Sequence, residues 1–223
     1  NYGEEGACPQ YIGTRNMGSN AAQDLAFIEG SIDLFAGFYG DIWDIWENDI
    51  GTGTKVTTWY EHDAPYFKAT ASMINMVPNM QKHELFAVKE FRQALAYAID
   101  YDHIPGDAAS GYWKRAKPGY MTPDAVLDAP YYNDEIDEDL YVLDVDEAIS
   151  LLEGIPGMSG SASSGWTYNG VAVGPYTMIT PRWWGDVAMF TQFVCDDITD
   201  NLGIEITKLE VDKSPDYDNM VID

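Results

Sequence analysis

Residues 84–104 read ELFAVKEFRQALAYAIDYDHI. Apolar side chains recur in this stretch every three or four residues, at Leu85, Val88, Phe91, Leu95, Ala98 and Ile99. This spacing places them in one stripe along an α-helix, because a helix turns once in about 3.6 residues. Charged and amide side chains fill the other side, at Lys89, Glu90, Arg92 and Gln93. The pattern predicts an amphipathic helix over residues 84–104 with one buried face.

Other segments carry local signals of the same kind. Apolar periodicity predicts helices at residues 23–29, 41–48, 144–152 and 186–201. Residues that favour extended structure predict strands at 31–34, 55–60, 66–75, 171–180 (bent at Gly174-Pro175) and 204–211. Glycine and serine are frequent in residues 154–170, which predicts a loop. Asp144 and Glu147 have the spacing of a capping box at a helix start, and Gly203 lies just beyond the last helix.

Four stretches of the chain carry a resemblance when they are taken together. They are FIEGSIDL at 27–34, FRQALAYAIDYDHI at 91–104, LDVDEAISLL at 143–152, and the last helix with its Gly203-Ile204 turn into a strand. In this order and spacing they resemble family 5 of the extracellular solute-binding proteins, the receptors of ABC importers for peptides, nickel and some oligosaccharides. The family usually has arginine where this chain has Tyr101. That departure concerns an ion pair at a helix end, not the fold.

The resemblance implies an α/β fold of the periplasmic-binding-protein kind, type II and of the large peptide-binding class, with a mixed sheet flanked by helices. Residues 1–223 would form a single lobe, the second of the two lobes of such a receptor. The first lobe and the returning C-terminal segment are expected to lie outside this chain.

The implied function is that of the substrate-binding component of an ABC transporter, which captures extracellular oligopeptides for import. An oligosaccharide ligand is the alternative within the family. The full-length protein would work with an ABC permease as a monomer, in the periplasm or outside the cell, anchored at the cell surface as a lipoprotein. No enzymatic activity is expected.

Charge is the strongest global feature of the composition. The chain has 37 acidic and 12 basic residues and a formal net charge of −25. Such a field repels nucleic acids and anionic membranes, so we expect neither as a partner. Residues 133–147 hold eight acids, but they lack the glycine and the closing glutamate of an EF-hand loop. A solvated acidic surface is the prediction, and no metal site.

Motifs for catalysis are missing from the sequence. There is no Gly-x-Ser-x-Gly elbow and no His-Glu-x-x-His pair, and residues 51–55 lack the spacing of a phosphate loop. The histidines are scattered, at His62, His83 and His103. We therefore expect no catalytic residue, metal or cofactor. Two hypotheses from other functional classes compete with the receptor. One is an enzyme, a carbohydrate-active domain with paired carboxylates, and the other is an acidic interaction domain.

The segment PRWWGD at residues 181–186 is the best candidate for ligand binding. It joins a strand end to a helix start, and ligands of open α/β folds lie at that edge. Trp183 and Trp184 offer flat faces for stacking, Arg182 can pair with a carboxylate, and Asp186 is a candidate helix cap. Family analogy adds Tyr66. The alternative for the tryptophans is packing within or over the lobe.

The two cysteines leave several arrangements open. Cys8 and Cys195 can form one disulfide with each other, can both be free buried thiols, or can be one of each. No apolar run reaches the roughly 20 residues that span a bilayer.

Overall fold

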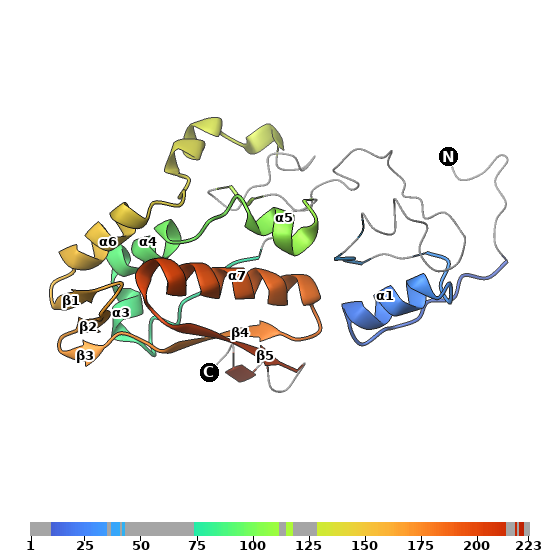
Figure 1. Ribbon diagram of the computed structural model, residues 1–223. Helices are drawn as coiled ribbons and strands as arrows, with labels where there is room; N and C mark the ends of the chain where they lie inside the picture. Colours follow the sequence, from blue (N-terminus) through green and yellow to red (C-terminus); the bar gives the residue numbers. More distant parts are fainter. Residues whose placement is uncertain are drawn as a thin grey trace.

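The computed structural model describes residues 10–34, 37–40, 42, 74–111, 115–117, 129–212, 217 and 219–220. Its α-helices are α1 (Asn20–Ile28), α3 (Glu84–Ala87), α4 (Lys89–Tyr97), α5 (Ile104–Ala109), α6 (Val145–Gly154) and α7 (Gly185–Leu202). Two 3-10 helices are η2 (Ala129–Tyr131) and η3 (Asp134–Asp139). The strands are β1 (Met158–Ser161), β2 (Gly165–Tyr168), β3 (Val171–Ala172), β4 (Tyr176–Pro181) and β5 (Ile206–Val211) (Figure 1).

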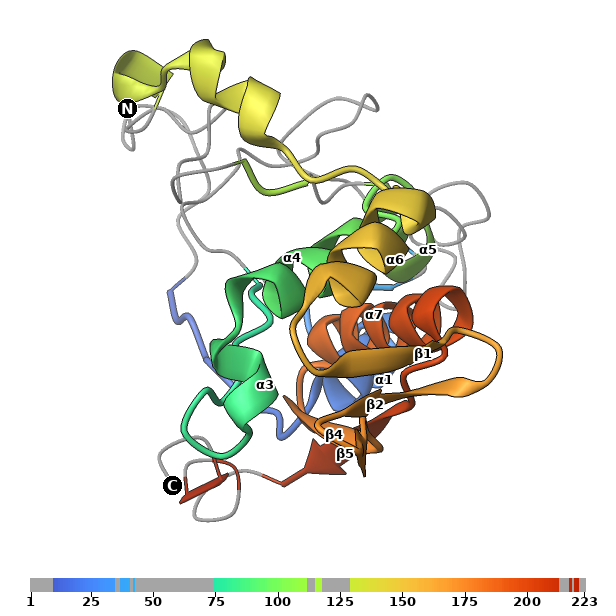
Figure 2. The same cartoon turned by 90° about the vertical axis from the view of Figure 1, so that its left-hand side faces the viewer.

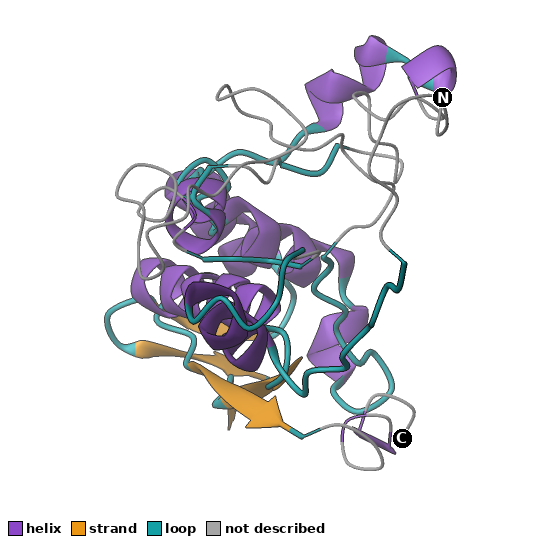
Figure 3. Cartoon of the chain, turned by 90° about the vertical axis from the view of Figure 1, so that its right-hand side faces the viewer, coloured by secondary structure: helices purple, strands orange, loops and turns teal. Residues whose placement is uncertain are grey.

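The described strands form two small sheets. β1, β2 and β3 are antiparallel neighbours in that order. β4 and β5 are parallel, in register from Tyr176 with Ile206 to Pro181 with Val211. α7 connects these two strands, which makes a βαβ unit. Figure 3 shows the strands gathered on one side of the helices.

Helix α7 lies between the strands β4 and β5 and the helices α4 and α6. It packs on β4 and β5, and α4 and α6 pack against each other on its other side (Figures 1 and 2). The α/β class predicted from the sequence is therefore confirmed. No helix in the described part of the chain is long and apolar enough to cross a membrane.

The core forms where these helices meet. Phe91 of α4, Leu152 of α6 and Ile198 and Leu202 of α7 are fully buried. Burial of one such side chain contributes about 1.5–3 kcal/mol. Trp166 of β2 is buried as well, and its indole N–H donates to the carbonyl of Leu202 at 2.8 Å. That bond fastens the antiparallel sheet to the end of α7.

The predicted helix over residues 84–104 keeps its buried stripe but is not continuous. Val88 is extended (φ −73°, ψ 123°) and separates α3 from α4. The guanidinium of Arg92 donates to the carbonyl of Phe86 at 2.8 Å, which satisfies the end of α3. Further on, the N–H of Asp100 donates to the Asp197 carboxylate at 2.9 Å. Because side-chain partners take these backbone groups, the helical ladder stops twice.

The loop prediction for residues 154–170 is wrong in part, since β1 and β2 lie there. A Cβ on Gly160 would lie 2.1 Å from the carbonyl oxygen of Gly165, so the two strands approach too closely for a side chain. The hydroxyls of Ser159 and Thr167 meet across the strands at 2.9 Å. Glycine here marks close strand approach, not a loop.

The strand predicted at residues 31–34 is not formed. The backbone N–H and the hydroxyl of Ser31 both donate to the carbonyl of Ala26, each at 2.9 Å. These bonds complete the end of α1, so Ser31 belongs to the helix cap and not to a strand. The helix predicted at 41–48 lies outside the described residues except for Ile42, which is helical. The strands predicted at 55–60 and 66–75 also lie outside them, except for residues 74–75, which are not in a strand.

Several local predictions are confirmed. The strand at 171–180 is divided into β3 and β4 around Gly174-Pro175, a cis peptide bond. Gly203 has φ 64° and ends α7. Asp144 caps α6 by accepting from the N–H of Glu147 at 2.9 Å. The second bond of the predicted capping box is absent, because the N–H of Asp144 donates to the carbonyl of Tyr97 at 2.9 Å.

Candidate functional site

The parallel strands β4 and β5 end at the same edge of their sheet. Arg182 follows β4 and Asp212 follows β5. The N–H of Arg182 donates to the carbonyl of Val211 at 3.0 Å, which extends the pairing by one bond. This edge is the place where parallel α/β sheets present their loops to ligands.

Carboxylates of β5 and the following residue surround the guanidinium of Arg182. Its Nη1 lies 3.1 Å and 3.3 Å from the two oxygens of Asp212, and its Nε lies 3.9 Å from Glu210. Its Nη2 donates to the carbonyl of Glu210 at 3.0 Å. Glu210 also meets Lys208 Nζ at 2.8 Å, and this bond holds the pKa of Glu210 below its usual value, helped by the nearby Arg182. The positive charge of Arg182 is therefore compensated within the lobe.

Aromatic rings continue the edge beyond Arg182. The rings of Trp183 and Trp184 lie 6.1 Å apart at 58°, and Tyr217 meets Trp183 edge-on at 5.5 Å. The side chain of Trp184 is 53% exposed, whereas Trp183 is half-buried. The carbonyl of Trp183 accepts from the N–H of Asn20 at 3.4 Å, so the start of α1 also lies here. Trp184 is the ring most available for stacking on a solute.

A hollow of about 390 Å³ opens at the same edge, with Arg182 in its lining. Arg182 after β4 is one wall, and the others come from the end of β5, the residue after it and the C-terminal segment, namely Leu209, Glu210, Val211, Asp212, Asn219 and Met220. The mixture of apolar, amide and charged groups suits a solute with both polar and apolar parts.

Of the predicted residues, the structure brings Arg182, Trp183 and Trp184 together at this edge. Tyr66 lies outside the described residues. Sequence reasoning missed Tyr217 and Asn219, because the short stretch around them has no periodicity that would place it at β5.

Asp186 does not cap α7, contrary to the prediction. The helix starts at Gly185 after Trp184, whose side chain makes no capping bond. Asp186 lies inside the first turn and is 9% exposed, and burial raises the pKa of its carboxyl. Asp186 is therefore a buried residue of the first helical turn and not the N-cap.

Cys195 is a buried free thiol in α7, and burial raises its pKa to about 11. Cys8 lies outside the described residues. Within the described ranges, no three His, Cys, Asp or Glu side chains are grouped so as to hold a metal ion.

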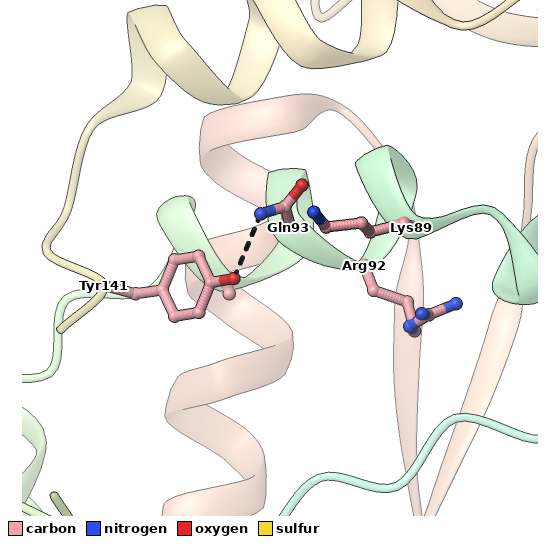
Figure 4. A pocket seen from close by; sticks show the side chains of 5 residues that line it. Lys89, Arg92, Gln93 and Tyr141 are labelled. Atoms are coloured by element: carbon pink, nitrogen blue, oxygen red, sulfur yellow. Dashed lines mark hydrogen bonds between the residues drawn. The ribbon is translucent and has the colours of Figure 1, made fainter. Parts of the chain in front are cut away.

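A second hollow, of about 400 Å³, lies over α4 on the side of α7 away from the strands (Figure 4). Lys89, Arg92, Gln93, Ala96 and Tyr141 line it. The amide of Gln93 donates to the hydroxyl of Tyr141 at 3.3 Å, and Arg92 points away from this pair. Lys89 and Arg92 are the charged groups of this lining, and Arg92 already donates to the carbonyl of Phe86. Two positive charges do not outweigh the net charge of −25, so this hollow offers little to an anionic ligand.

Comparison with known families identifies the chain. A family model described as bacterial extracellular solute-binding proteins, family 5 Middle, matches residues 1–218. The chain belongs to this family. The resemblance seen in the four motifs is thus confirmed.

Two solved structures have the same fold as this family 5 chain. One is the periplasmic oligopeptide-binding protein of an oligopeptide ABC transporter from Thermotoga maritima with bound mannohexaose, at 23% identity and a TM-score of 0.70 over 90% of this chain. The other, described as the periplasmic oligopeptide-binding protein of an oligopeptide ABC transporter from the same organism, has 22% identity and a TM-score of 0.64 over 89% of this chain. The chain spans 36% and 35% of their lengths. No curated protein sequence matches it.

Proposed function

We propose that this family 5 chain is one lobe of the substrate-binding receptor of an ABC transporter, and that the receptor captures oligopeptides. The observation that carries the proposal is the edge at β4 and β5, where Arg182 lines a hollow of about 390 Å³ and is followed in the chain by the paired rings of Trp183 and Trp184. Residues 1–223 supply a single lobe, and the opposing face of the cleft comes from the rest of the receptor.

In this function the lobe binds and does no chemistry. Trp184 would cover an apolar part of the solute, while Asn219, Asp212 and the outward N–H groups of Arg182 offer hydrogen bonds to its polar part. Closure of two lobes on the solute would then present a different surface to the permease. We place the receptor in the periplasm or outside the cell, anchored at the surface and monomeric.

An oligosaccharide is the second candidate ligand, and the charge balance of Arg182 favours it. Asp212 and Glu210 already pair with this guanidinium, so a peptide carboxylate would have to compete with them. A neutral sugar needs no free charge and can use the same polar groups together with a tryptophan face. The mannohexaose bound to the Thermotoga maritima protein supports this alternative.

Tryptophan fluorescence of the full receptor, titrated separately with a pool of short peptides and with mannose oligosaccharides, tests the proposal. We expect a saturable change with one pool. Trp184→Phe should remove most of that change, whereas Trp166→Phe, a substitution of a buried indole far from the edge, should preserve it. A receptor that responds to neither pool, or a change that survives Trp184→Phe intact, contradicts the proposed site.

A further inference from the structure

His103 joins α5 to the second half of α7, a helix whose first residue follows Trp184 of the candidate site. It is the residue before α5, and its Nδ1 lies 2.9 Å from the carboxylate of Asp107, which is a residue of α5. Its Nε2 lies 3.5 Å from Asp197 of α7. The imidazole also packs edge-on against the ring of Phe193, at 5.3 Å and 88°. One side chain therefore contacts carboxylates of both helices at once.

Asp197 connects three parts of the chain. Besides His103, it accepts from the backbone N–H of Asp100 in the turn that follows α4. Its side chain is only 17% exposed, whereas those of His103 and Asp107 are 32% and 59% exposed. Protons can therefore reach the imidazole from solvent, while the α7 carboxylate remains fixed beneath it.

The two protonation states of His103 differ in how many of these contacts they can satisfy. An imidazolium has two N–H donors, one for each carboxylate. A neutral imidazole has a single donor, so one ring nitrogen must turn its lone pair toward an acceptor-only carboxylate. Loss of the proton thus replaces one of these two attractions by repulsion, and when the remaining proton stays on Nδ1 toward the nearer Asp107, the lost attraction is the one between His103 and Asp197 of α7.

We propose that His103 is a protonation-controlled clamp that fastens α5 to α7, closed as the imidazolium and loosened as the neutral ring. The groups that face it are all acidic: Asp107 from α5, Asp197 from α7 and Asp100 from the preceding turn.

The electrostatic surroundings agree with the clamp. The bond to Asp107 raises the pKa of His103 above its ordinary value, and Asp197 and Asp100 add to this, against the opposing effect of burial. The pKa of His103 is higher in the folded chain than in the unfolded chain. The stabilisation that protonated His103 gives the folded chain is therefore complete below the ordinary histidine pKa. It is lost as the pH rises through the raised value.

The rest of α5 determines what the clamp controls. Ile104 and Ala108 anchor the helix in the core, so it stays attached when the clamp loosens. At its far end the hydroxyl of Ser110 donates to the carbonyl of Gly40, which ties residues 37–40 to α5. The clamp therefore governs how firmly α5, and the segment bound to its end, is held against α7.

Amide hydrogen exchange of the full chain between pH 5 and pH 8.5, corrected for intrinsic rates, tests the clamp. The reporters are the amides of Asp100, Asp107 and Gly111, whose partners are Asp197, His103 and Pro105. We expect them to open about tenfold more often at the high pH, as loss of one charge-assisted bond implies, while amides within α7 remain protected.

Variants separate the clamp from a general effect of pH. His103→Gln should abolish the change in exchange. The control is His83→Gln, which should preserve it, because His83 is exposed and has no carboxylate contact within the described part of the chain. Asp107→Asn alters an exposed side chain and should reduce the change without unfolding the chain. Equal protection at both pH values in the natural chain, or a pH dependence that persists in His103→Gln, overturns the proposal.

Discussion

The carboxyl group of Asp24 makes the stability of the folded chain depend on pH. Oδ1 of Asp24 in α1 is buried and has no hydrogen-bond partner among the residues that the structure describes. Burial raises the pKa of this carboxyl to about 6. Because the folded pKa lies above the unfolded one, stability from this group is present at low pH and is lost as the pH rises through about 6.

Asp24→Asn should therefore stabilise the chain at pH 7.5 and leave its stability nearly unchanged at pH 4.5. A buried group without a partner costs about 1–3 kcal/mol, and an amide avoids the part of this cost that comes from charge. Thermal unfolding at the two pH values measures the effect, with the exposed Asp33→Asn as the control. Equal effects of Asp24→Asn at both pH values would contradict the burial argument.

Helices depend on the residues that cap them. Helix α6 starts at a side-chain cap, whereas α7 ends at a glycine. Asp144 accepts from the N–H of Glu147 at the start of α6. Asp144→Ala should lower the free energy of unfolding by about 0.5–2 kcal/mol, as loss of an N-cap does elsewhere. Urea unfolding measures this loss. Asp146→Ala, at the second residue of the helix, is the control, and a loss as large there would show that charge near the helix start matters more than the cap.

Gly203 at the end of α7 permits a contact that no side chain would. Its φ is 64°, and a Cβ would lie 1.9 Å from the carbonyl oxygen of Ala162. Gly203→Ala should destabilise the chain by about 2 kcal/mol or more, since strain and collision add. Gly154→Ala in α6, where a Cβ meets nothing within 4 Å, should be neutral or stabilising. A similar stability for the two variants in urea unfolding would refute the close approach.

The same elements show what the sequence could reveal. The buried stripe from Leu85 to Ile99, the cap at Asp144 and the glycine end of α7 were predictable, because each signal lies within a few residues of its effect. The break at Val88 and the turn at Asp100 were not, since Arg92 and Asp197 impose them from other positions. The β1–β2 hairpin was hidden because its glycines mark close packing, which in sequence looks like a loop.

At the candidate site, too, the local signals were predictable from the sequence, and the contacts between residues distant in sequence were not. The segment 181–186 stood out because a strand end, two tryptophans and a helix start are consecutive. That Asp212 and Glu210 compensate the charge of Arg182 follows only from the parallel pairing of β4 and β5, which puts residues about 30 apart at one edge. Asp186 was misassigned because the helix starts one residue earlier than predicted.

At the scale of the whole molecule, the net charge of −25 opposes the compact state. Salt should therefore raise the thermal midpoint, because the screening length falls from about 30 Å at 0.01 M to about 3 Å at 1 M. Sodium and potassium chloride should act alike, since screening depends on concentration and not on a specific site. A midpoint that falls with salt, or that rises with one cation alone, would contradict this explanation.

The proposed receptor function rests on the edge at β4 and β5, and Trp184 is its most exposed ring. The most direct measurement is the dissociation constant of the full receptor for whichever pool it binds. Trp184→Ala is compared there with Tyr131→Ala, which also removes an exposed aromatic ring, from η2. We predict that Trp184→Ala weakens binding by about tenfold or more, as loss of an aromatic anchor does, and that Tyr131→Ala leaves it unchanged. Equal affinity of the Trp184→Ala receptor and the natural one would contradict the account, because the solute would then bind elsewhere.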